Sequence, residues 1–342
     1  MSRASEQINI GQRSEAEGDY VAAAAAYRAM IAASDPRVAA EGYFLLGRVC
    51  WRQGRLEAAL AAYESAAASA ERLHDTELHA RISNGMGAAH YARGDHDAAR
   101  TAYAAAEAKT TDLTLQGKVL LNLGVIESAE GNHEEARDFY HSAYLLFEES
   151  GDSQSATLAL HNRGMVEADL GLWHEADESF RAALGLAAAT DDREMLARTL
   201  VNRSETLVEL ESFAEAIDHC DRALAIYADI GDEVGRGESL RWRAHALGRS
   251  GNLVWAERNA AEALNIAMRA GARLLEAQSA RDLGVLRGLM GDRAGGAKEL
   301  RRALALFTSL GARKEATEVG AMIQRPTPNR SLRRIEDLEN PD

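Results

Sequence analysis

Residues 120–136 read LLNLGVIESAEGNHEEA, residues 160–176 read LHNRGMVEADLGLWHEA, and residues 200–216 read LVNRSETLVELESFAEA. The three stretches begin 40 residues apart. Each has an Asn at its third position, a small residue two positions later and an Ala at its end. A fixed period of this length indicates a repeat architecture in which each unit is one supersecondary motif. The sequence therefore predicts an array of similar units.

The period extends over most of the chain. A turn residue recurs every 36 to 40 residues, at Gly18, Gly54, Gly94, Gly131, Gly171, Glu211, Gly251 and Gly291. Seven residues before it lies a small residue: Gly11, Gly47, Gly87, Gly124, Gly164, Ser204, Ala244 or Gly284. Nine residues after it lies a larger side chain in most units, as at Tyr27, Tyr63, Tyr103, Tyr140 and Phe180.

These positions have a direct physical meaning. Small residues let two helices cross closely, an aromatic side chain fills the gap beside them, and Gly ends a helix in the left-handed conformation. We therefore expect eight helical hairpins from residue 5 to about residue 310, with a last helix at about 312–324 that caps the array. Residues 1–324 then form one solenoid. Residues 325–342 contain three of the four prolines and mixed charges, and are expected to be a disordered tail.

Composition narrows the function. The chain has 342 residues, of which 46% are apolar and 27% charged, and its net charge is −14. An acidic chain argues against a broad nucleic-acid or anionic-membrane surface, because phosphate binding needs clustered positive charge. No run of about 18 apolar residues occurs, so no membrane segment is expected and the predicted location is cytoplasmic. Cys50 and Cys220 are expected to be buried, reduced thiols.

No catalytic or metal motif stands out. The patterns HExxH, GxSxG, paired CxxC and GxxxxGK[ST] are absent from the sequence. Two residue pairs are candidates: His133 with His141 as metal ligands, and Glu127 with Glu167 as paired carboxylates. His133 lies beside a hairpin turn and is expected to be solvated. Glu127 and Glu167 are expected to cap helices or to form salt bridges with Arg of a neighbouring repeat. We expect no enzyme activity, no cofactor and no metal.

The spacing small-x6-G-x4-A-x3-[YF]-x2-A resembles the tetratricopeptide repeat. The units here are longer than the usual 34 residues and resemble those of kinesin light chains and of bacterial regulators that sense peptides or oligosaccharides. The resemblance implies an all-α fold, a right-handed α-α superhelix of about eight hairpins with a C-terminal capping helix. It also implies a concave groove, lined by the first helix of each hairpin, that binds a protein or peptide partner.

The recurring Asn marks candidate groove residues. Asn122, Asn162 and Asn202 occupy one position in three consecutive first helices, and each amide offers a donor and an acceptor. The resemblance implies that this ladder pairs with the backbone of an extended peptide. The alternative is that the ladder bonds repeat to repeat inside the array.

The C-terminal half supplies the other candidates. They are the polar and aromatic residues expected on the same face: His161, Arg198, Glu205, Arg241, Trp242, His245, Arg249 and Arg281. Trp with flanking Arg is the composition of an interface hot spot, and Arg binds carboxylates by paired hydrogen bonds. The alternative is intramolecular pairing with Glu209, Glu238 and Asp282. Arg163, Arg203 and Arg243 stand where the family prefers Leu, which predicts that this position is partly exposed.

Three functions follow as hypotheses. The first is a scaffold whose groove holds a segment of a protein partner. The second is the sensor module of a bacterial regulator, which binds a small peptide or sugar and acts in trans. The third is a self-associating adaptor that oligomerises through its N-terminal repeats, where Phe44 and Leu45 predict an apolar face.

Overall fold

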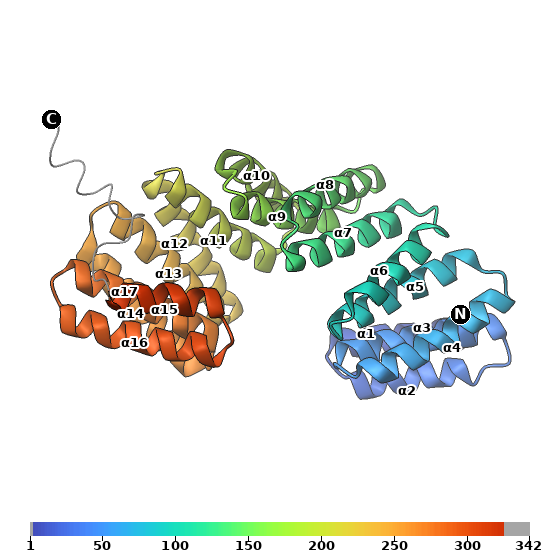
Figure 1. Cartoon of the computed structure of the whole chain (residues 1–342). Helices are drawn as coiled ribbons and strands as arrows, with labels where there is room; N and C mark the ends of the chain where they lie inside the picture. Colours follow the sequence, from blue (N-terminus) through green and yellow to red (C-terminus); the bar gives the residue numbers. More distant parts are fainter. Residues whose placement is uncertain (1–2, 325–342) are drawn as a thin grey trace. The chain divides into compact units, whose positions relative to one another are not determined.

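The computed structural model describes residues 3–324, and within that range the chain forms α-helices joined by short turns, without strands (Figure 1). The chain divides into two compact units, of which unit 1 ends at Ala159 and unit 2 begins at Leu160, inside helix α9. The predicted tail lies outside the described residues. The all-α repeat architecture predicted from the sequence is confirmed.

In unit 1 the helices are α1 (Arg3–Ala16), α2 (Tyr20–Ile31), α3 (Pro36–Arg52), α4 (Leu56–Arg72), α5 (Thr76–Ala92), α6 (His96–Glu107), α7 (Leu113–Glu130) and α8 (His133–Ser150). Helix α9 (Ser153–Asp169) follows. In unit 2 they are α10 (Trp173–Ala189), α11 (Arg193–Glu209), α12 (Phe213–Ile230), α13 (Glu233–Arg249), α14 (Leu253–Ala270), α15 (Arg273–Leu289), α16 (Arg293–Ser309) and α17 (Arg313–Gln324).

Helices pack in consecutive pairs. In unit 2, α11 packs on α12, α13 on α14, and α15 on α16, while α17 packs on α16. The first helices of successive pairs also contact one another, α11 with α13 and α13 with α15. This stacking places the faces of α11, α13 and α15 side by side, and the candidate site lies on these faces.

The small residues lie where the two helices of a hairpin cross. A Cβ atom on Gly47 would lie 2.6 Å from the ring of Tyr63, and one on Gly164 would lie 2.8 Å from the ring of Phe180. Real Cβ atoms do not approach this closely, so the aromatic ring takes the space that Gly leaves. The crossing predicted from the sequence is confirmed.

The turns use the left-handed backbone conformation. Gly131 has φ 85° and caps α7, and Gly251 has φ 88° after α13. The slot without Gly keeps the same geometry, since Glu211 has φ 58°. The repeat therefore fixes the backbone of this turn even where the residue pays a steric penalty for it.

One expectation about exposure is wrong for Arg203. The Arg163 and Arg243 side chains are partly exposed, but the Arg203 side chain is only 6% exposed. Its Nε donates to Asp177 Oδ1 of α10 over 2.7 Å, and the guanidinium also contacts Glu215 and His219 of α12. Partners on two other helices make burial of this charge tolerable where the family has Leu.

Candidate functional site

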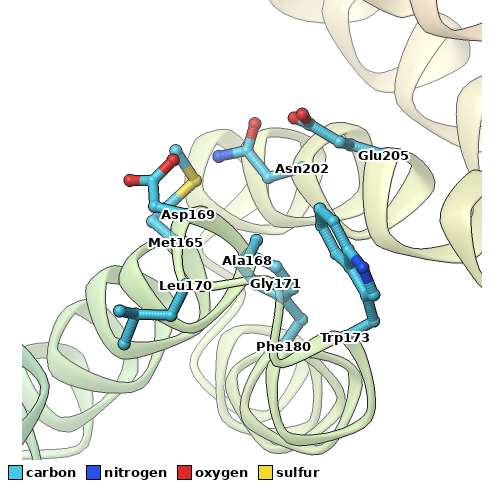
Figure 2. Close-up of a pocket in the computed structure, with 9 residues that line it drawn as sticks. All are labelled: Met165, Ala168, Asp169, Leu170, Gly171, Trp173, Phe180, Asn202 and Glu205. Atoms are coloured by element: carbon cyan, nitrogen blue, oxygen red, sulfur yellow. The ribbon is translucent and has the colours of Figure 1, made fainter. Parts of the chain in front are cut away.

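Two cavities open beside the first helices of unit 2. The first, of about 400 Å³, lies where α9 ends, α10 begins and α11 passes (Figure 2). Its polar side chains are Asp169, Trp173, Asn202 and Glu205, and Met165 and Phe180 add apolar surface. We call it the acidic pocket.

A hydrogen-bond chain beneath the acidic pocket orients Asn202. Burial, reinforced by the charge of Arg198, lowers the pKa of His161 to about 3, so its imidazole is neutral. A neutral imidazole has one donor and one acceptor nitrogen. Asn202 Nδ2 donates to Nε2 over 3.3 Å, which leaves Nδ1–H to donate to Thr199 Oγ1 over 2.9 Å. The carbonyl oxygen of Asn202 has no hydrogen-bond partner within residues 3–324.

Glu205 is half-buried in the wall of the same pocket. Burial raises the pKa of its carboxyl above the ordinary value, although the charges of Arg241 and His245 lower it. The carboxylate makes no hydrogen bond or ion pair with any residue that the structure describes. Burying an unpaired carboxylate costs free energy, so a ligand that pairs with Glu205 gains binding free energy.

The second cavity, of about 250 Å³, lies between α11, α13, α15 and α17. We call it the tryptophan pocket. Four candidates predicted from the sequence line it: Trp242, His245, Arg249 and Arg281. Its apolar wall includes Val208, Val285 and Met322. Glu209 also lines it, four residues after Glu205 on α11. Residues at this spacing share a helix face, so both cavities open on one side of α11.

Asp282 organises the charges of the tryptophan pocket. Its buried carboxylate accepts from His245 Nε2 over 2.7 Å, from Arg281 Nε over 3.0 Å and from Arg241 Nη1 over 3.3 Å. Burial alone would raise the pKa of Asp282, but the interactions with His245, Arg281 and Arg241 hold it well below its ordinary value. These groups are fixed to one another before any ligand arrives, so binding does not have to order them.

The ring of Trp242 is held between two neighbours. The guanidinium carbon of Arg241 lies 4.5 Å from the ring centroid, and the His245 ring centroid lies 4.9 Å away. Cation–π contact and ring packing of this kind restrict the indole to one orientation. The indole is still partly exposed and lines the cavity.

The structure separates these predicted residues into four groups. Asn202 and Glu205 lie in the acidic pocket, and Trp242, His245, Arg249 and Arg281 in the tryptophan pocket. His161 and Arg241 lie buried behind them. Arg198 is exposed and lies in neither cavity, and its Nη2 is 3.3 Å from the sulfur of Met195.

The Asn ladder has different surroundings at each step. In unit 1, Asn122 Nδ2 donates to Asn84 Oδ1 over 3.1 Å, a bond from one hairpin to the preceding one. Asn202 bonds to His161, and the half-buried Asn162 has no side-chain hydrogen bond among the residues described. Contact of the ladder with a ligand stays a prediction.

The sequence predicts several of the Arg–carboxylate pairs as its intramolecular alternative, but it does not predict Trp173 as a site residue. Arg249 donates to Glu209 over 3.2 Å, and Arg241 and Arg281 pair with Asp282, as in the intramolecular alternative. Trp173 lies outside the first-helix positions on which the prediction rests, at the start of α10. The sequence could have indicated Trp173, because it directly follows the turn Gly171–Leu172. That turn brings the start of α10 beside the end of α9.

The predicted apolar face of the N-terminal repeats is largely covered. Leu45 is 3% exposed and belongs to the core of unit 1. Phe44 packs against Tyr63, and the guanidinium of Arg81 lies 4.6 Å from its ring centroid. Self-association through these residues would require a surface that unit 1 already uses internally.

Residues 3–324 contain neither a membrane-spanning helix nor a cluster of metal-ligating side chains. None of the helices in this range is both long and apolar enough to cross a membrane. Nor does this range place three His, Cys, Asp or Glu side chains where they could hold a metal ion. Cys50 and Cys220 are buried free thiols.

Consecutive helical hairpins with small residues where their helices cross define a helical-repeat protein. Tetratricopeptide repeat models match residues 38–109, 84–154 and 155–229. The chain belongs to the tetratricopeptide repeat family. The matching models describe repeats, and no catalytic family is indicated. No curated protein sequence matches the chain.

Solved structures share the fold over nearly the whole chain. The apo form of RapI is 14% identical, with a TM-score of 0.71, and the match covers 98% of both chains. A Rap protein in complex with competence and sporulation factor is 12% identical, with a TM-score of 0.59, over 94% of this chain and 95% of that one. The apo quorum sensor NprR from B. thuringiensis is 13% identical, with a TM-score of 0.57, over 94% and 96%. At these identities the likeness is one of fold.

Proposed function

We propose that this chain is a non-catalytic scaffold that binds an extended segment of a partner protein across α11, α13 and α15. The observation that carries the proposal is the tryptophan pocket. It combines a fixed, partly exposed indole with an apolar wall and charges that are already paired. Hot spots at protein interfaces have this composition, with Trp and Arg at the centre of a preformed pocket.

The fold supports a binding role of this kind. A Rap protein has been solved with competence and sporulation factor bound, and the similar NprR is described as a quorum sensor. A second candidate function is therefore a sensor in which the same pocket takes a small ligand. A scaffold and a sensor differ in response: the ligand of a sensor changes the shape of the array, whereas the partner of a scaffold needs only to be held.

Selection of peptides tests the proposal without knowledge of the partner. A random dodecapeptide library is displayed on phage and selected on the full chain, and the dissociation constant of a synthetic selected peptide is measured by calorimetry. We expect Trp242→Ala to raise the dissociation constant about 30-fold, the loss typical of a hot-spot Trp. The melting temperature of the variant, measured alongside, reports whether the fold is intact.

The chain contains a matched control. Trp255 on α14 also carries an Arg over its ring, since Arg258 lies 4.9 Å from the centroid, but the residue is 52% exposed and lines neither pocket. Trp255→Ala should leave the dissociation constant unchanged. Equal losses in the two variants, or no selected peptide at all, would contradict the proposal.

Small-angle scattering with and without the peptide then separates scaffold from sensor, because only the sensor should change its radius of gyration.

A further inference from the structure

We infer that the acidic pocket receives a cationic side chain of the bound segment, and that the guanidinium of arginine fits it best. The inference rests on the proposed function and adds the chemistry of the ligand. The pocket is the cavity of about 400 Å³ between the end of α9 and α11.

The pocket presents mainly hydrogen-bond acceptors. Asp169 and Glu205 contribute carboxylates, and the carbonyl oxygen of Asn202 has no hydrogen-bond partner within residues 3–324, while its NH₂ group donates to His161. Among the side chains that line the cavity, the Trp173 indole N–H and the Asn202 amide are the only donors. A ligand with several donors and no acceptor satisfies this lining, whereas a carboxylate or phosphate would meet charges of its own sign.

The surrounding charges leave Glu205 uncompensated. Asp169 and Glu209 both act on Glu205 with the same sign of charge. The nearby side chains of Arg241 and His245 are themselves hydrogen-bonded to the buried Asp282. A cation from a ligand would therefore be the first direct partner of the Glu205 carboxylate among the described residues.

The aromatic side of the pocket favours a planar cation. Figure 2 shows the indole of Trp173 rising from the start of α10 toward Glu205, with Met165 and Asp169 on the other side of the opening. A guanidinium stacks on an indole face while its edge donates to carboxylate and carbonyl oxygens. An ammonium group pairs with the carboxylates but does not stack, so lysine should bind more weakly.

Small probes test the pocket apart from any peptide. Nα-acetyl-arginine methylamide, the lysine equivalent and the neutral isostere Nα-acetyl-citrulline methylamide are titrated into the ¹⁵N-labelled full chain. The indole N–H signal of Trp173 is followed by NMR and assigned with Trp173→Phe. We expect a saturable shift with the arginine probe, a weaker one with the lysine probe and none with the citrulline probe.

Isosteric variants identify the acceptors. Glu205→Gln and Asp169→Asn should each weaken binding of the arginine probe about tenfold, the value of one charge-assisted hydrogen bond. Glu178→Gln, which neutralises an exposed carboxylate on α10 outside the pocket, should have no effect. The melting temperature of each variant, measured alongside, reports whether a loss of binding comes from unfolding.

Every outcome is decisive. No saturable shift, an equal shift with the citrulline probe, or equal binding by the Glu205→Gln variant would overturn the cation pocket. Equal binding of the arginine and lysine probes would support the cation pocket and overturn the preference for guanidinium. If selected peptides bind at the tryptophan pocket but the arginine probe does not bind, the inference fails and the proposed function stands. If the probe binds and no peptide is selected, the proposed function fails alone.

Discussion

At the scale of single residues, each hairpin crossing depends on a matched pair of side-chain sizes. Gly164 leaves room for Phe180, and in the next unit Ser204 stands opposite the smaller Cys220. The pair after that is Ala244 and Ala260, both fully or almost fully buried. A larger residue on the first helix is therefore matched by a smaller one on the second helix, as close packing requires.

Gly164→Ala tests this pairing. The added Cβ would lie 2.8 Å from the Phe180 ring, so the ring or the helix must shift. We expect a loss of about 1–3 kcal/mol in the free energy of unfolding, measured by urea denaturation. Gly185→Ala on α10 is the control, because nothing lies within 4 Å of its Cβ position. It should be neutral or stabilise by about 0.5–1 kcal/mol. Similar losses in both variants would refute the pairing.

His161 makes stability depend on pH. Its pKa is lowered from 6.5 to about 3 in the folded chain, mainly by burial. The unfolded chain therefore takes up the proton first, and stability falls as pH drops from 6.5 toward 3. At pH 5 this costs about 2 kcal/mol relative to pH 7.

The contribution of His161 is isolated by substitution. Urea unfolding of the His161→Gln variant at pH 7 and pH 5 should show a smaller loss of stability than the wild type. His174→Gln, at an exposed position, should keep the wild-type pH dependence. A His161→Gln variant with the full wild-type loss would mean that the imidazole is not buried in its neutral form.

At the scale of elements, the sequence predicts the hairpins well because their signals are local. The turn glycines, the small crossing residues and the aromatic residue nine positions after each turn lie within one unit. The environment of Arg203 could not be predicted in this way. Its partner Asp177 lies on α10, 26 residues earlier, and nothing in the repeat spacing brings the two together.

Arg203→Leu tests whether the ion pair between Arg203 and Asp177 stabilises the fold. Leu is the residue that the family prefers there, yet it would leave the largely buried Asp177 with Arg181 as its remaining ion-pair partner among the residues described. We expect a loss of about 3–5 kcal/mol in the free energy of unfolding. The double variant Arg203→Leu with Asp177→Leu should recover a large part of it, since both charges are then removed. Full stability of the single variant would show that the pair contributes little.

The candidate site was predicted only in part for a similar reason. Residues on the first helices, such as Asn202 and Trp242, follow from the repeat register. Trp173 and the charge arrangement around Asp282 depend on how neighbouring hairpins stack. Register shows which face a residue occupies, but only the packed structure shows which residues share a cavity.

At the scale of the whole molecule, the chain consists of two units, and the candidate site belongs to the second. Both cavities that carry the proposals lie within unit 2, on α9 to α11 and on α11 to α17. In a repeat protein each hairpin is stabilised mainly by its neighbours, so binding to one group of hairpins protects that group first. Binding of a segment across α11, α13 and α15 should therefore protect these helices and leave unit 1 unchanged.

Hydrogen–deuterium exchange, with and without a selected peptide, tests the claim most directly. The account predicts slower exchange in α11, α13 and α15 of unit 2 and no change in α3 and α5 of unit 1. The Trp242→Ala variant should lose this protection, and the Trp255→Ala variant should keep it. Protection confined to unit 1, or protection of unit 2 that survives Trp242→Ala, would contradict the account.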